Sequence, residues 1–262
     1  MNRRNFVRSS IAAGAILGSP TSMQSVAEKK NTRLWYELRT YHFTNEDQRQ
    51  LTETYLEHAY LPALDRGGIG PAGVFTEVQS QDIAKLYLLV PFSSLQSMAD
   101  LEKKLAHDTD YVKAGEAYLN APASSPAYLR IDSSLLRAFV HMPAIDAPEK
   151  NPRIFELRCY ESPSESAGQK KIEMFNDAGE IDIFKRVGAR PVFFGETIIG
   201  ERRPNLTYML CFADMQAHDA CWKAFGNDPD WKRLKGMDEY SDARLISKIT
   251  RTFLAPTGYS RI

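Results

Sequence analysis

Two similar stretches decide the fold of this 262-residue chain: Tyr36-Glu37-Leu38-Arg39-Thr40-Tyr41 and Phe155-Glu156-Leu157-Arg158-Cys159-Tyr160, 119 positions apart. Further matches follow at nearly the same spacing. Asp108 to Lys113 is matched by Asp228 to Arg233, and Leu86 to Leu89 by Thr207 to Leu210. Three matches in one order at one spacing indicate an internal duplication.

Each copy shows the same order of expected elements. The first predicts strands at 34–43, 73–79, 85–90 and 135–141, and the second at 153–160, 191–199, 206–212 and 245–254. A helix is expected after each opening strand, capped by Asn45 with Gln48 and by Ser162 with Pro163 and Glu165. A second helical region follows each third strand, where Ser93 with Gln96, and Asp214, can cap. The order β-α-β-β-α-β is that of a ferredoxin-like unit.

The duplication predicts how the two copies are arranged. One ferredoxin-like unit has helices on one sheet face only, so its other face must be covered. Two tandem units can cover each other, which predicts an α+β fold with an intrachain α/β barrel and a cavity between the sheets. We expect domains at 34–141 and 153–256, joined by a linker at 142–152 that carries three prolines and followed by a tail at 257–262.

The first 27 residues are expected to be a targeting segment. A basic start with Arg3 and Arg4 precedes a short apolar run, and Ala27 ends a plausible cleavage site, leaving 28–33 as the mature N-terminal tail. The paired arginines match the twin-arginine export signal, so the Tat export machinery is an expected partner and the periplasm or the outside the expected location. The alternatives are an ordinary secretory leader and an uncleaved membrane anchor. The mature form is not expected to span a membrane.

Composition excludes some classes of function. The chain is 43% hydrophobic and 25% charged with a formal net charge of zero, which is typical of a globular protein. Loss of the leader removes three arginines and no acid, leaving 30 basic against 33 acidic residues. Nucleic acid is therefore not an expected partner.

The quoted motifs resemble a known family. The aromatic-Glu-Leu-Arg-x-Tyr strand, the helix after it and Asp228-Pro229-Asp230-Trp231 are similar to NIPSNAP domains of the dimeric α/β-barrel superfamily. The resemblance covers both copies, from Leu34 to Pro256, and is weaker in the first, which has Thr109 and Tyr111 in the later motif. It implies the barrel and pairing of units, hence a homo-oligomer as one expected state. The superfamily includes monooxygenases without metal and heme enzymes.

The opening strands carry the candidate ligand-binding residues. Alternation places Glu37, Arg39 and Tyr41 on one face of the first strand. Glu156, Arg158 and Tyr160 repeat this set in the second copy. If the apolar face meets the helices, the charged sets face the barrel interior and can bind a polar or anionic small molecule. The alternative is that the pairs neutralise each other and fix the packing.

His58 and the cysteines complete the candidates. His58 has no counterpart in the second copy and either marks a specialised site or is an ordinary helix position. Cys159 and Cys211 lie on neighbouring expected strands, where they either form a bridge or are buried apolar side chains. No ligand spacing for a metal appears. No cofactor is predicted, and the sequence neither requires heme nor argues against it.

These observations predict an exported NIPSNAP-like protein that binds a small organic molecule inside the barrel. A cofactor-independent oxygenase or isomerase is one reading of that site. The alternatives are a non-catalytic binding or assembly protein and a heme-binding barrel with His58 as axial ligand.

Overall fold

A computed structural model describes residues 32–80 and 83–262 of the chain. The expected targeting segment, with Arg3, Arg4 and the cleavage site after Ala27, lies outside the described residues. The first half is one ferredoxin-like unit. Its elements are, in chain order: β1 Trp35–His42, α1 Glu46–Tyr55, the π-helical turn η1 Leu56–Tyr60, α2 Leu61–Arg66, β2 Gly73–Glu77, β3 Leu86–Phe92, α3 Leu95–Ala99, α4 Leu101–His107, α5 Thr109–Ala114, α6 Glu116–Leu119 and β4 Arg130–Ala138.

The second half repeats this order. Its elements are, in chain order: β5 Ile154–Glu161, α7 Glu165–Asn176, α8 Glu180–Arg186, β6 Arg190–Ile199, β7 Asn205–Phe212, α9 Met215–Asn227, α10 Pro229–Gly236, the 3₁₀ turn η2 Asp238–Tyr240, α11 Asp242–Leu245 and β8 Lys248–Pro256. The predicted duplication of a β-α-β-β-α-β unit is confirmed.

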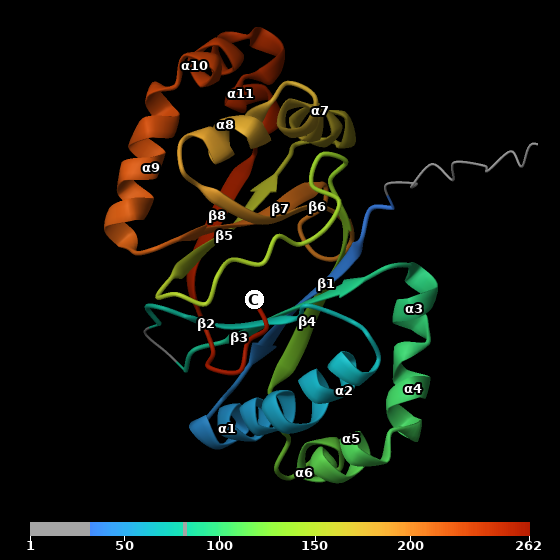
Figure 1. Cartoon of the computed structure of the whole chain (residues 1–262). Helices are drawn as coiled ribbons and strands as arrows, with labels where there is room; N and C mark the ends of the chain where they lie inside the picture. The colour runs from blue at the N-terminus through green and yellow to red at the C-terminus, as the bar shows by residue number, and fades with distance from the viewer. Residues whose placement is uncertain (1–31, 81–82) are drawn as a thin grey trace, which may run out of the picture. The chain divides into compact units, whose positions relative to one another are not determined.

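The eight strands form one closed barrel in the order β1-β3-β2-β8-β5-β7-β6-β4. Each half contributes four neighbouring strands, and the antiparallel pairs β2–β8 and β4–β6 join the halves. In Figure 1 the helices α1 to α6 cover one side of the barrel and α7 to α11 the opposite side. The expected intrachain α/β barrel is therefore confirmed, and closure leaves no open sheet edge.

Local capping follows the sequence with small shifts. Asn45 caps α1 and Asp214 caps α9, as expected, each accepting a bond from the backbone N–H three residues on. In two other helices the cap lies later than predicted, at Ser94 for α3 and at Ser164 for α7. In both cases a second serine offers the same side-chain oxygen, so cap chemistry alone does not fix the position.

Each sheet is buried on both faces, and this decides which side chains meet. Between β1 and the helices of the first half lies an apolar cluster that includes Tyr41, Tyr55 and Leu88. Another cluster fills the barrel interior and draws on both halves, with Tyr36, Phe155 and Met209 among its members. The even-numbered residues of β1 therefore point inward and the odd-numbered ones point toward the helices.

The residues after β8 close one end of the barrel. The Thr257 N–H donates to the Val74 carbonyl and the Arg261 N–H to the Ala72 carbonyl, so this segment runs along β2. The side chain of Ile262 is buried in the interior cluster beside Phe75. Among the helices of residues 32–80 and 83–262, none has the length and apolar character needed to cross a bilayer.

Candidate functional site

The barrel interior changes character along its length. Interior positions of β1 run from Tyr36 and Leu38 to Thr40 and His42. On β5 they run from Phe155 and Leu157 to Cys159, in the same direction. The apolar end is packed by large side chains, whereas the polar end is open.

A cavity of about 480 Å³ lies at the open end. Both halves line it, because the ends of β1, β4, β5, β7 and β8 meet there. Most lining residues carry a hydroxyl, amide or charged group. The polar lining includes Thr40, His42, Glu77, Lys85, Tyr87, Asp132, Ser134, Cys159, Arg202, Asn205, Thr207 and Thr250. A cavity of this size suits a small organic molecule.

One wall of the cavity carries a tyrosine held by a carboxylate. The Tyr87 hydroxyl donates to Glu77 Oε1 at 2.9 Å, and Lys85 Nζ lies 3.7 Å from the same oxygen. Burial, followed by the charge of Glu77, raises the pKa of Tyr87 well above its usual value. The phenol therefore stays protonated at neutral pH, and its hydroxyl hydrogen is donated to Glu77.

The neighbouring strands β1 and β4 carry a histidine paired with an acid. His42 Nε2 lies 2.7 Å from Asp132 Oδ2, and the His42 side chain is 16% exposed. Arg130 donates to both oxygens of Asp132, at 3.0 and 3.2 Å. The hydrogen bond from Arg130, followed by that from His42, lowers the pKa of Asp132, so this carboxyl stays ionised. An imidazole oriented by a carboxylate is an arrangement that can transfer protons.

Cys159 lines the cavity but is not activated. Burial raises the pKa of its thiol, and the neighbouring Thr207 and Arg202 offset only part of that effect. A protonated thiol is a poor nucleophile. Cys159 and Cys211 are both free, because Cys159 pairs in register with Thr207 and Cys211 with Phe155. The bridge considered from the sequence does not form, and Cys211 is a buried side chain of the interior cluster.

The β6–β7 hairpin forms part of the cavity rim and carries a cation. Arg202 has a left-handed backbone with φ of 60°. The Asn205 amide holds this conformation by donating to the carbonyls of Glu201 and Arg202 at 3.0 and 3.1 Å. Within the part of the chain that the structure describes, no ion pair forms on Arg202. Its guanidinium is therefore available to an anionic group in the cavity.

The predicted charged set of the first half does not face the cavity. Glu37 and Arg39 form a bidentate pair, with Arg39 Nε 2.6 Å and Nη2 2.9 Å from the two carboxylate oxygens. Arg39 lies over the ring of Tyr60, on the helical side of the sheet, and the buried Tyr41 packs in the cluster under those helices. The expectation that these residues point into the barrel is wrong, because the inward set of β1 is the apolar one.

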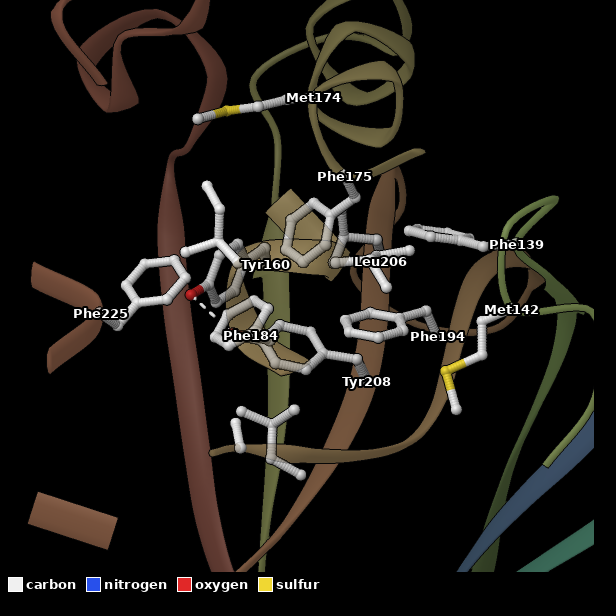
Figure 2. Close-up of a cluster of buried hydrophobic side chains, with 14 of the residues drawn as sticks. Phe139, Met142, Tyr160, Met174, Phe175, Phe184, Phe194, Leu206, Tyr208 and Phe225 are labelled. Atoms are coloured by element: carbon white, nitrogen blue, oxygen red, sulfur yellow. Dashed lines mark hydrogen bonds between the residues drawn. The ribbon is translucent and has the colours of Figure 1, made fainter. Parts of the chain in front are cut away.

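The second half shows the same orientation. Arg158 Nη1 donates to Glu156 Oε1 at 2.7 Å, and its guanidinium lies 4.4 Å from the centre of the Trp222 ring on α9. Tyr160 lies in the aromatic cluster under α7 and α8, where its hydroxyl accepts a bond from Tyr208 at 2.9 Å (Figure 2). These residues are also outside the cavity, and no ligand-binding role for either set has been tested.

His58 is separate from both groups. It lies on η1 with its side chain 63% exposed, 3.7 Å from Glu57. A heme inside the barrel would therefore not take His58 as its ligand, and the histidine that lines the cavity, His42, already has Nε2 bound to Asp132. Among residues 32–80 and 83–262, no group of three or more His, Cys, Asp or Glu side chains is placed to hold a metal.

Sequence reasoning missed His42, Asp132 and Arg202. A signal for His42 was present, since it continues the even-numbered face of the opening strand. Because most residues of that face are apolar, the sequence predicts that it packs against the helices, and His42 is therefore not among the predicted cavity residues. Asp132 and Arg202 come from distant strands and a hairpin, and only closure of the barrel brings them to the same rim.

Comparison with known proteins supports the fold and part of the family resemblance. Residues 155–261 match the NIPSNAP family model, so the second half contains a NIPSNAP domain. No curated protein matches the chain.

Two solved structures share the architecture over most of the chain. A proposed monooxygenase from Lactobacillus acidophilus NCFM superposes with a TM-score of 0.57 at 10% identity, over 86% of this chain and 94% of that one. Another from Fusobacterium nucleatum gives 0.54 at 9%, over 86% and 93%. A NIPSNAP family protein from Agrobacterium tumefaciens gives 0.37 at 20%, over 41% and 96%. At these identities the likeness concerns the fold alone.

Proposed function

We propose that this protein binds a small polar organic molecule in the cavity at the open end of the barrel. The observation that carries the proposal is the division of the interior into a packed apolar end and an open polar end. A barrel that needed only a core would gain stability by filling both ends with apolar side chains. Here the open end instead carries polar side chains, among them Thr40, Ser134 and Arg202.

The lining indicates the kind of molecule. Hydroxyl and amide groups match a ligand with carbonyl or hydroxyl oxygens, and Arg202 matches a carboxylate or another anionic substituent. Leu38 and Leu157 form the apolar floor between the polar rim and the packed end, which suits a short hydrocarbon part.

A fragment screen by saturation-transfer NMR tests the proposal on two matched variants. Thr250 and Ile249 are neighbours on β8, but Thr250 lines the cavity whereas Ile249 is 42% exposed outside it. Thr250→Phe fills the site and Ile249→Phe adds the same ring elsewhere. We expect fragments that bind wild type to bind Ile249→Phe and to be lost with Thr250→Phe. Binding that survives Thr250→Phe, or no binding at all, contradicts the proposal.

A second candidate function is a cofactor-independent oxygenase or isomerase. The feature that favours it is the His42–Asp132 pair on the cavity wall. Two structures of the same fold carry a proposed monooxygenase assignment, which agrees with this candidate. Turnover of a bound molecule, with loss of turnover in His42→Gln, separates the catalytic candidate from a non-catalytic binding or assembly protein.

We also propose that both halves are NIPSNAP domains in tandem and that the chain is exported folded through the Tat machinery. Support comes from the repeated motif at 119 positions and from Arg3 and Arg4. Cell fractionation of the full chain tests the route. Substitution of both arginines by lysine is expected to retain the protein in the cytoplasm with an unprocessed N-terminus. Equal export of that variant argues for an ordinary secretory route.

A further inference from the structure

We propose that the cavity is a proton-transfer site in which His42, oriented by Asp132, removes a proton from the carbon next to a carbonyl group of the bound molecule. This inference rests on the proposed binding function and specifies its chemistry. The substrate class is a small carbonyl compound with an acidic C–H, and a carboxylate on it would match Arg202.

The geometry of His42 defines which nitrogen reacts. His42 is the last residue of β1 and lines the cavity. Its Nε2 lies 2.7 Å from the ionised Asp132, so Nε2 carries the hydrogen and donates it to the carboxylate. The lone pair is then on Nδ1, which is the atom that accepts a proton. Asp132 also stabilises the imidazolium that forms, as a carboxylate does when it orients a catalytic imidazole.

Asp132 is itself fixed, which makes it a positioning residue. Arg130 donates to both carboxylate oxygens of Asp132. Arg130 lies opposite His42 in the β1–β4 pair, and Asp132 lies two residues further along β4, so the three side chains are neighbours. Because the carboxylate is bound by Arg130 as well as by His42, it keeps its negative charge and does not take the proton from the ring. The proton that His42 removes therefore stays on the imidazole until it is returned to the substrate.

The remaining groups of the cavity complete the step. The proton moves from the substrate carbon to His42 Nδ1, the C–H electron pair forms a carbon–carbon double bond, and the carbonyl electron pair moves to oxygen. The hydroxyl groups of Thr40 and Ser134 line the same side of the cavity and can donate to that oxygen. Return of the proton to the same carbon gives exchange. Where the enolate is conjugated with a further carbon–carbon double bond, return to the far carbon of that system shifts the double bond and gives isomerisation. Neither needs an oxidant.

Other residues of the cavity do not compete for this role. The thiol of Cys159 stays protonated, and the Tyr87 proton is bound to Glu77. His58, the histidine singled out by the sequence, is exposed on the outer face of η1. Among the described residues that line the cavity, His42 supplies the imidazole, and its Nε2 is held by Asp132.

Hydrogen exchange of 2-oxobutyrate in D₂O, followed by proton NMR at its C3 position, tests the proposal on the full chain. We expect wild type to accelerate exchange and His42→Gln to slow it by about 100-fold or more, the usual effect of losing a general base. His58→Gln is the matched control and is expected to exchange as wild type does. Equal rates in wild type and His42→Gln, or no acceleration by wild type, overturn the proposal.

The variant Asp132→Asn tests whether Asp132 positions His42, because a purely structural role would leave the pH profile of exchange unchanged. Loss of the carboxylate favours the wrong ring tautomer and removes the stabilisation of the imidazolium, so exchange should slow and the midpoint of its pH profile should move to lower pH. The other charged groups near His42 are Arg130, Lys85 and Glu46, and all are unchanged in this variant. A slower rate with an unmoved pH profile contradicts the positioning role of Asp132.

The same probe separates failure of this inference from failure of the binding proposal. Saturation transfer to 2-oxobutyrate that is lost in Thr250→Phe, without exchange, leaves the binding site standing and refutes His42 as a base. Absence of any cavity-dependent binding across the fragment screen refutes both.

Discussion

Replacing Arg158 with methionine tests whether the Glu/Arg pairs stabilise the fold. The change removes the guanidinium and leaves an apolar side chain about as long as the aliphatic part of arginine, near Trp222. It also leaves the Glu156 carboxylate, whose side chain is fully buried, without its charged partner. Since the pair lies between β5 and α9 and not in the cavity, we expect loss of stability without loss of ligand binding.

The magnitude follows from the surroundings of Glu156. Removing one partner of a buried ion pair costs about 3 to 5 kcal/mol. The Trp222 Nε1–H still donates to the carboxylate at 2.9 Å, and His218 Nε2 lies 3.3 Å from the same oxygen, though without hydrogen-bond geometry. These contacts place the expected loss in the free energy of unfolding at the lower end, about 3 kcal/mol. For a domain of this size that loss lowers the Tm by about 6 to 12 °C.

Urea unfolding followed by tryptophan fluorescence measures this loss, with two further variants. Arg233→Met removes an arginine that is 62% exposed and 3.8 Å from Asp230, and it should cost less than about 1 kcal/mol. The double variant Glu156→Gln/Arg158→Met should recover part of the loss, because no buried charge is left unpaired. A loss below about 1 kcal/mol for Arg158→Met, or a double variant less stable than the single one, refutes the reasoning.

Three further predictions concern the cavity. Gly200→Ala should lower the free energy of unfolding in urea by about 1 to 3 kcal/mol, because Gly200 has a φ of 149° and a Cβ there would lie 2.5 Å from Ser134 Oγ; an unchanged midpoint contradicts this. Burial raises the pKa of the Cys159 thiol, so iodoacetamide at pH 8 should label Cys159 more slowly than a free cysteine peptide by mass spectrometry, and rapid labelling would show an activated thiol. Arg202→Gln should weaken binding of 2-oxobutyrate about tenfold with no change for uncharged 2-butanone, whereas equal effects on both argue that Arg202 only shapes the hairpin.

The sequence by itself predicted the architecture well. The repeated strand at Tyr36 and Phe155, and the order of strands and helices after it, depend on local alternation and capping, which neighbouring residues determine. Closure followed from a simple requirement, since each sheet had one face left to cover. Errors were small and local, as at Ser94 and Ser164, where a serine one or two residues earlier offered an equivalent cap.

The location of the site was decided by the tertiary structure alone. Alternation divides β1 into two sets of residues, but it does not say which set faces the helices when both faces of the sheet are buried. Polarity suggested that Glu37 and Arg39 face inward, yet charges that neutralise each other are compatible with a sheet–helix interface. The rim formed by His42, Asp132 and Arg202 joins residues far apart in sequence. Pairing of β1 with β4 brings His42 and Asp132 together, and closure of the barrel through the β4–β6 pair brings Arg202 to the same end.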